Sequence, residues 1–115
     1  MRLIVCGGRD FKNISRVNHV LHAVHARKPI TLLIEGGAAG ADRLAREWAI
    51  ANDVPYQTFN ADWKAHGKAA GPIRNGKMIH EGKADGVLAF PGGRGTANMV
   101  EQGLENGLKV MEVSP

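Results

Sequence analysis

The segment TLLIEGGAAGADRLAREW, residues 31–48, combines three patterns that together decide the fold. Residues 32–34 form a short apolar run that is typical of a buried strand. Residues 36–40 hold three glycines, and residues 41–48 then place apolar side chains at helical spacing. A strand therefore passes into a helix through a turn that has almost no side chains. Such a turn lets another group approach the backbone closely.

The same alternation of strand and helix patterns continues along the chain. Strands are predicted at residues 3–5, 54–59, 86–90 and 109–113, and helices at 14–24, 73–80 and 96–106, the last ending before Gly107. Continuous apolar strands between amphipathic helices indicate a sheet that is covered on both faces. We therefore predict a single three-layer α/β domain over residues 1–115, with a mainly parallel sheet of about five strands.

Composition limits the environment and the partners of this chain. Its 15 basic and 11 acidic residues give a net charge of +4, which favours an anionic partner such as a nucleotide, a sugar phosphate or nucleic acid. The single cysteine, Cys6, cannot form an internal disulfide. Neither a signal pattern nor an apolar run of ~20 residues is present. A cytoplasmic protein without membrane contact is expected.

Three glycine-rich turns follow predicted strands. In a parallel sheet these turns meet at one edge, where helix N-termini offer free N–H groups to phosphate. We therefore predict a phosphate-binding edge, with Thr96 and Asp42 either capping their helices or touching the ligand. The residues concerned are Gly7, Gly8 and Arg9; Gly36, Gly37, Ala38, Gly40 and Asp42; and Pro91, Gly92, Gly93, Arg94, Gly95 and Thr96.

Four motifs resemble a known family. They are GGRD (7–10), GGAAGADRLAREWA (36–49), ADWKAHGKAAGPIRNGKM (61–78) and FPGGRGTANM (90–99). Together they are similar to the YspA-like, cpYpsA-related branch of the SLOG superfamily, over nearly the whole chain. The resemblance implies a Rossmann-like fold that binds nucleotides or nucleotide-derived ligands. PGGRGT, with Arg74 and Lys77, more distantly resembles the LOG phosphoribohydrolases.

The chain departs from the LOG enzyme pattern at Met99. The LOG pattern has a glutamate there, which helps to cleave the N-glycosidic bond, whereas a thioether cannot act as a general base. Glu35 and Asp42, beside the glycine turns, are the candidate replacements for this carboxylate. Each also has a purely structural interpretation, Glu35 as an acceptor for nearby backbone N–H groups and Asp42 as a helix-start residue.

Further side chains are candidates for ligand contacts. Arg74 and Lys77, three residues apart on one helix, either bind a phosphate or pyrophosphate or belong to a solvated helix face. Asn75 either binds a ribose hydroxyl or phosphate or caps local backbone. Arg9 and Arg94 point to the same edge or serve only as solubilising charges. Trp63 either stacks on a base or packs over the sheet edge.

No metal site is predicted. His19, His22 and His25 are spaced by three, but successive members drift about 60° around the helix and spread over its polar face. Cys6 ends a strand and is interpreted as a small buried side chain, not a nucleophile.

The leading functional hypothesis is a binding protein. The ligand is expected to be a nucleotide-derived small molecule, of the ADP-ribose type or a cyclic nucleotide signal, held for sensing or sequestration by a homo-oligomer. One alternative is a nucleotide-processing enzyme, either an N-glycosidase or a phosphohydrolase. A second is a single-stranded nucleic-acid binder, for which few aromatic side chains are available. No cofactor is predicted with certainty.

Overall fold

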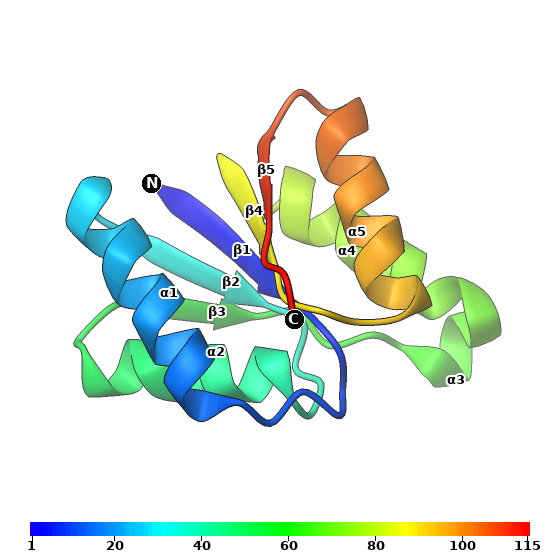
Figure 1. The fold of residues 1–115 in the computed structure, drawn as a ribbon. Coiled ribbons are helices and arrows are strands. Elements are labelled where there is room, and N and C mark those ends of the chain that lie inside the picture. The colour runs from blue at the N-terminus through cyan, green and yellow to red at the C-terminus, as the bar shows by residue number, and fades with distance from the viewer.

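The computed structural model describes residues 1–115 as a parallel sheet with helices on both faces (Figure 1). The strands are β1 (Arg2–Cys6), β2 (Leu32–Glu35), β3 (Tyr56–Thr58), β4 (Gly86–Ala89) and β5 (Lys109–Glu112). The helices are α1 (Ile14–Arg27), α2 (Ala41–Ala51), α3 (Trp63–His66), α4 (Ala70–His80) and α5 (Arg94–Glu105), with a 3₁₀ turn, η1 (Gly67–Ala69), between α3 and α4. None of these helices is long and apolar enough to span a bilayer.

The strand order is β3-β2-β1-β4-β5, and every neighbouring pair is parallel. Leu3 of the central strand pairs with Leu33 of β2 on one side and with Gly86 of β4 on the other. The chain runs outward from β1 to β3 and then returns to place β4 on the other side of β1. This reversal between β1 and β4 is a topological switch point, where open parallel sheets bind ligands beyond their carboxyl ends.

Each face of the sheet has its own hydrophobic core. Because side chains alternate along a strand, Leu3 and Val5 of β1 pack on one side, and Ile4 and Cys6 pack on the other. Helices α1 and α2 cover the first core, and α4 and α5 cover the second (Figure 1). The predicted three-layer arrangement with a parallel sheet is therefore confirmed, and the five strands are all parallel.

The predicted element boundaries differ from the structure in two places that matter for the site. The helix predicted at residues 73–80 begins at Ala70 and is preceded by α3 and η1. Pro72 is tolerated in its first turn because the N–H groups there have no intrahelical acceptor. Helix α5 begins at Arg94, two residues before the predicted start at Thr96.

Asn13 caps α1 by accepting a hydrogen bond from the N–H of Arg16.

Candidate functional site

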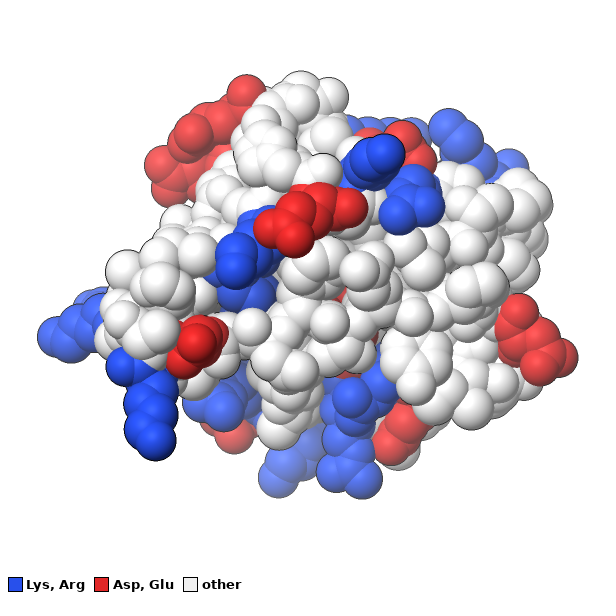
Figure 2. Space-filling view, turned by 180° about the vertical axis from the view of Figure 1, so that it is seen from behind, with Lys and Arg blue, Asp and Glu red and all other residues white.

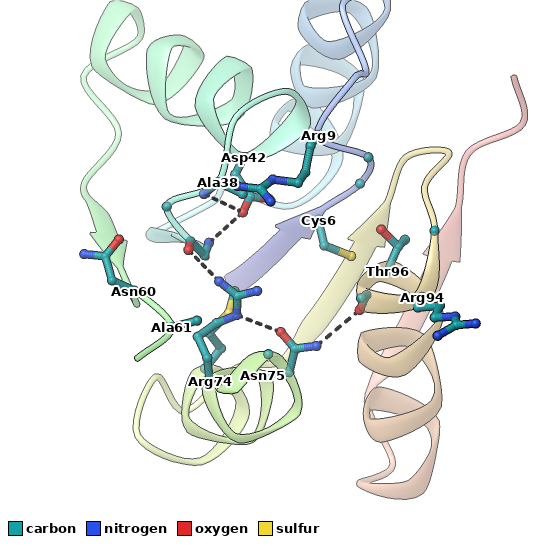
Figure 3. A pocket seen from close by; sticks show the side chains of 18 of the residues that line it. Cys6, Arg9, Ala38, Asp42, Asn60, Ala61, Arg74, Asn75, Arg94 and Thr96 are labelled. Atoms are coloured by element: carbon teal, nitrogen blue, oxygen red, sulfur yellow. Dashed lines mark hydrogen bonds between the residues drawn. The ribbon is translucent and has the colours of Figure 1, made fainter. Parts of the chain in front are cut away.

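A cavity of about 490 Å³ opens at the carboxyl ends of the strands (Figure 3). Its volume lies within the range of small-molecule sites. The lining comes from the loops after β1, β2, β3 and β4 and from one face of α4, so it surrounds the switch point. The lining residues are Cys6, Gly7, Gly8, Arg9, Gly36, Gly37, Ala38, Asp42, Asn60, Ala61, Trp63, Gly71, Arg74, Asn75, Met78, Gly93, Arg94, Gly95 and Thr96.

Most of the residues singled out in the sequence meet around this cavity, but five of them lie outside its lining. These are Glu35, Gly40, Lys77, Pro91 and Gly92. A Cβ at Gly40 would lie 2.5 Å from the carbonyl oxygen of Arg9, and one at Gly92 would lie 2.7 Å from the nitrogen of Gly8. Both glycines therefore allow the loops to pack on one another. Lys77 is exposed on the outer surface of α4.

The start of α5 offers unpaired backbone donors to the cavity. The N–H groups of Gly93, Arg94, Gly95 and Thr96 have no intramolecular acceptor, and Ala97 is the first residue here whose N–H is bonded, to the Gly93 oxygen at 3.0 Å. A Cβ at Gly93 or Gly95 would meet no atom within 4 Å. Free N–H groups at the positive end of a helix dipole, next to open space, make an anion-binding site.

The turn after β2 is different, because its own carboxylates occupy its donors. The N–H groups of Gly36 and Ala38 both donate to Oδ2 of Asp42, each at 3.2 Å. The N–H of Gly37 donates to Oε1 of Glu35 at 2.7 Å, while the Thr58 hydroxyl donates to Oε2. Two buried acidic side chains thus take the place that a phosphate would have in this turn. The predicted phosphate-binding edge therefore contains two kinds of turn. The N–H groups at the start of α5 are free, whereas those of the turn after β2 are already bonded to carboxylates.

A chain of hydrogen bonds through α4 connects these two turns (Figure 3). Arg74 Nη1 donates to the carbonyl oxygen of Gly36 at 2.6 Å, and Arg74 Nε donates to Asn75 Oδ1 at 3.0 Å. Asn75 Nδ2 in turn lies 3.2 Å from the carbonyl oxygen of Gly95 and 3.1 Å from Asn98 Oδ1. Asn75 is buried, so these bonds are shielded from water. The chain fixes the distance between opposite walls of the cavity.

One face of α4 forms the floor of the cavity. Gly71, Arg74, Asn75 and Met78 are spaced by three, one and three residues, which places them on the same side of the helix. Arg74 and Asn75 were found from the sequence, whereas Gly71 and Met78 were not. Met78 lies within the predicted helix at this spacing, whereas Gly71 lies before its predicted start at residue 73. Asn60 and Ala61, in the loop after β3, were not predicted either: Asn60 lies outside the four motifs, and Ala61 begins one of them but has no polar side chain to mark it.

Two groups in the lining have raised pKa values. Burial raises the pKa of Asp42 from 3.8 to about 6; the hydrogen bond from Ala38 opposes the rise, the charge of Glu35 adds to it, and Arg74 opposes it. Burial, followed by the charge of Asp42, raises the pKa of the Cys6 thiol to about 12. The thiol stays protonated at neutral pH and is unsuited to nucleophilic attack.

Met99 lies in the core, away from the cavity. Its side chain is fully buried in the cluster that contains Met78, Ile34 and Val87, between α5 and the sheet. At this position a carboxylate would be directed into an apolar environment. Residue 99 therefore does not line the cavity, and its position differs from that of a residue that contacts the ligand.

The histidines of α1 contribute to packing on the opposite face of the sheet. His22 and His25 each contact Trp48 edge-on, with ring centroids 5.6 Å apart, and His25 Nδ1 accepts a hydrogen bond from the N–H of Ile30 at 2.9 Å. No group of three or more His, Cys, Asp or Glu side chains is placed to hold a metal ion.

The fold and site define a Rossmann-like α/β protein with its cavity at the switch point, and comparisons with known proteins identify the family. Residues 1–66 match the family described as "YspA, cpYpsA-related SLOG family". The Gene 61 protein of Mycobacterium phage D29 is 36% identical over 118 residues, which cover 96% of this chain and 94% of that protein. The chain belongs to the YspA, cpYpsA-related SLOG family.

A solved structure supports the fold. The X-ray structure of DNA processing protein A (DprA) from Streptococcus pneumoniae superimposes with a TM-score of 0.79 over 99% of this chain, at 19% sequence identity. The chain covers 50% of the length of that protein. At this level of identity the similarity establishes the Rossmann-like fold alone.

Proposed function

We propose that this protein binds a nucleotide or nucleotide-derived ligand, with a phosphate held at the start of α5. The observation that carries the proposal is the row of four unpartnered N–H groups from Gly93 to Thr96, which line the cavity at the positive end of a 12-residue helix. Phosphate is the anion for which such a row of backbone donors is best suited. Membership of the SLOG family supports a nucleotide as the source of that phosphate.

The other end of the cavity suits a base. Trp63 lines it although the side chain is 57% exposed, and α3 contributes no buried residue to the core. The ring edge lies near Gly71 of α4, and the exposed remainder offers a flat surface on which a base can stack. Asn60 lies in the same wall and adds amide hydrogen-bonding groups. A ligand of the ADP-ribose type or a cyclic nucleotide has the required combination of base and phosphate.

The biological role that we propose is sensing or sequestration of this ligand. Asp42 is the only acidic side chain in the lining, and the thiol of Cys6 is held protonated. Met99 is enclosed in the core. With these side chains the cavity is better equipped to hold a nucleotide than to cleave one.

A second candidate function is hydrolysis of the nucleotide, and Asp42 is the observation in its favour. A buried carboxyl with a pKa of about 6, beside an anion site, has the properties of a general acid or base. Chromatography of the nucleotide after long incubation with the protein distinguishes the two functions. Release of free base or ribose phosphate that stops in Asp42→Asn would establish the enzyme.

Nucleic acid is a weaker candidate ligand. On the face shown in Figure 2, lysine and arginine side chains are interspersed with aspartate and glutamate, so they form no continuous basic track there. Binding to phosphate backbones needs such a track and falls steeply with salt. Titration with a single-stranded oligonucleotide at several salt concentrations tests this alternative.

The proposal is tested by calorimetry with a panel of AMP, ADP-ribose and a cyclic dinucleotide, together with native mass spectrometry of protein purified gently from its host. We expect one nucleotide class to bind with micromolar or better affinity. The Trp63→Ala variant should bind this nucleotide about tenfold more weakly, since base stacking contributes about 1–3 kcal/mol. It should stay folded, because Trp63 is largely exposed. Absence of binding across the panel and of any retained nucleotide would contradict the proposal.

A further inference from the structure

The strand order arranges the walls of the cavity in a fixed sequence. Because the sheet runs β3-β2-β1-β4, the loop after β3 with Trp63 and the start of α5 after β4 lie at opposite ends. Strands are about 4.8 Å apart, so these ends are separated by roughly 14 Å. The turn after β2, with Asp42 behind it, lies between them (Figure 3). A nucleotide that spans the cavity would place its sugar near this middle wall.

Asp42 has one oxygen that remains free. Oδ2 accepts both hydrogen bonds of the turn, from Gly36 and Ala38, whereas Oδ1 accepts none. The side chain is 6% exposed and lines the cavity. The side-chain atoms that are both inaccessible to solvent and without a hydrogen-bond partner are Arg16 Nε and Trp48 Nε1. Oδ1 of Asp42 is not one of them, so it is accessible to solvent. The free oxygen is therefore reached through the cavity.

The chemistry of this oxygen restricts what lies against it. A carboxylate only accepts hydrogen bonds, so it repels a phosphate and pairs with a hydroxyl or amino donor. Its orientation is set in advance, because two backbone N–H groups hold the partner oxygen and Arg74 holds the carbonyl of Gly36. Among the parts of a nucleotide, the sugar carries hydroxyl donors and is the part placed at the middle wall.

We infer that Asp42 Oδ1 accepts a hydrogen bond from a sugar hydroxyl, so that the site selects ribonucleotides over their deoxy analogues. The inference rests on the proposed function and adds the substrate class. A hydrogen bond to a charged acceptor contributes about 1.5–3 kcal/mol, which corresponds to an affinity difference of about tenfold or more.

The test compares AMP with 2′-deoxy-AMP and 3′-deoxy-AMP by calorimetry. Wild-type protein should bind at least one deoxy analogue about tenfold more weakly than AMP. In Asp42→Asn the single oxygen is needed by the turn, and the amide NH₂ takes the place of Oδ1. The ratio of the affinity for AMP to the affinity for the discriminated deoxy analogue should then fall to about threefold or less. The same ratio should fall likewise in Asp42→Ala. A damaged turn alone would weaken all three ligands equally and leave the ratio unchanged.

Asp53→Asn is the matched control, because Asp53 follows the opposite end of α2 and has a φ of 54°, which asparagine adopts readily. It should retain the wild-type ratio. Equal binding of the three nucleotides to wild type, or an undiminished ratio in both Asp42 variants, would overturn the inference while leaving the proposed function in place. Failure of every nucleotide to bind would instead contradict the proposed function, and the inference with it.

Discussion

Arg74 Nη1 donates a hydrogen bond of 2.6 Å to the carbonyl oxygen of Gly36, which lies 38 residues earlier in the chain. A Cβ at Gly36 would lie 2.8 Å from Arg74 Cζ, so the guanidinium packs directly against this glycine. Helix α4 is thereby joined to the turn after β2, and Asn75 extends the connection to the start of α5. Of the three arginines in the cavity lining, Arg9, Arg74 and Arg94, only Arg74 makes such a connection.

We predict that Arg74→Ala weakens ADP-ribose binding by at least about tenfold, because it leaves the Gly36 carbonyl unpaired and frees the walls to move. Arg94→Ala should change the affinity by no more than about threefold, since Arg94 is exposed and Figure 3 shows its side chain pointing away from Arg74. Calorimetry of both variants, with Lys77→Ala on the outer surface of α4 as control, checks the order. A larger loss in Arg94→Ala would show that Arg74 has been assigned the wrong role.

Gly93→Val should remove phosphate binding without unfolding the protein. A Cβ added at Gly93 would meet no protein atom within 4 Å, so there is room for a side chain there, and the valine methyl groups should occupy the space in front of the free N–H groups. Affinity for AMP should fall at least about tenfold.

Gly76→Ala is the matched glycine control. It lies within α4 outside the lining, and an added Cβ comes only as near as 3.4 Å to Gln102 Oε1. This variant should bind normally and be more stable by about 0.5–1 kcal/mol in urea denaturation. If Gly93→Val bound AMP as tightly as Gly76→Ala, the anion site would have to lie elsewhere.

The raised pKa of Asp42 predicts a defined pH dependence of stability. Its pKa is 3.8 in the unfolded reference and about 6 when folded, so the folded protein holds the proton more tightly. The stability that this provides is complete below pH 3.8 and is lost as the pH rises through 6, with a limiting value of roughly 3 kcal/mol. Relative to Asp42→Asn, the free energy of unfolding of wild type should decline from pH 4 to 6.5 and then level off. Urea denaturation at each pH measures this difference, and a constant or rising difference would refute the assignment.

Met99→Glu should destabilise the protein without creating hydrolysis. Met99 is fully buried between α5 and the sheet, and an ionised carboxylate there would cost roughly 4 kcal/mol or more, or would take up a proton. Met99→Leu keeps the volume and should change the free energy of unfolding by no more than about 1.5 kcal/mol. A Met99→Glu protein as stable as wild type at pH 7 would mean that this position reaches solvent, and the enzyme hypothesis would then regain support.

Much of the fold could be predicted because its signals are local. The apolar run at residues 32–34 and the glycines after it specify β2 and its turn without reference to the rest of the chain. The meeting of the three glycine turns at one edge followed from the parallel sheet, and the residues from Gly7 to Arg9 and from Gly93 to Thr96 do line one cavity. The turns meet because the carboxyl ends of parallel strands lie at the same edge of the sheet.

The division of labour between the turns could not be predicted, because it depends on tertiary contacts. Glu35 belongs to β2, but the partner of its second oxygen is the hydroxyl of Thr58 in β3. Asp42 turns back to the N–H groups of Gly36 and Ala38 and so fills a turn that the sequence presents as empty. From the sequence alone, Met99 is only a helix residue near a glycine loop. The packing of α5 on the sheet places it in the core.

The most direct test of the proposed function is a titration of ¹⁵N-labelled protein with ADP-ribose, followed by the backbone amide resonances. We expect the amides of Gly93, Arg94, Gly95 and Thr96 to shift most, because their free N–H groups bind the phosphate, while those of Gly36, Gly37 and Ala38 stay bonded to Glu35 and Asp42. Large shifts at Gly36–Ala38 with unchanged resonances at 93–96 would contradict it.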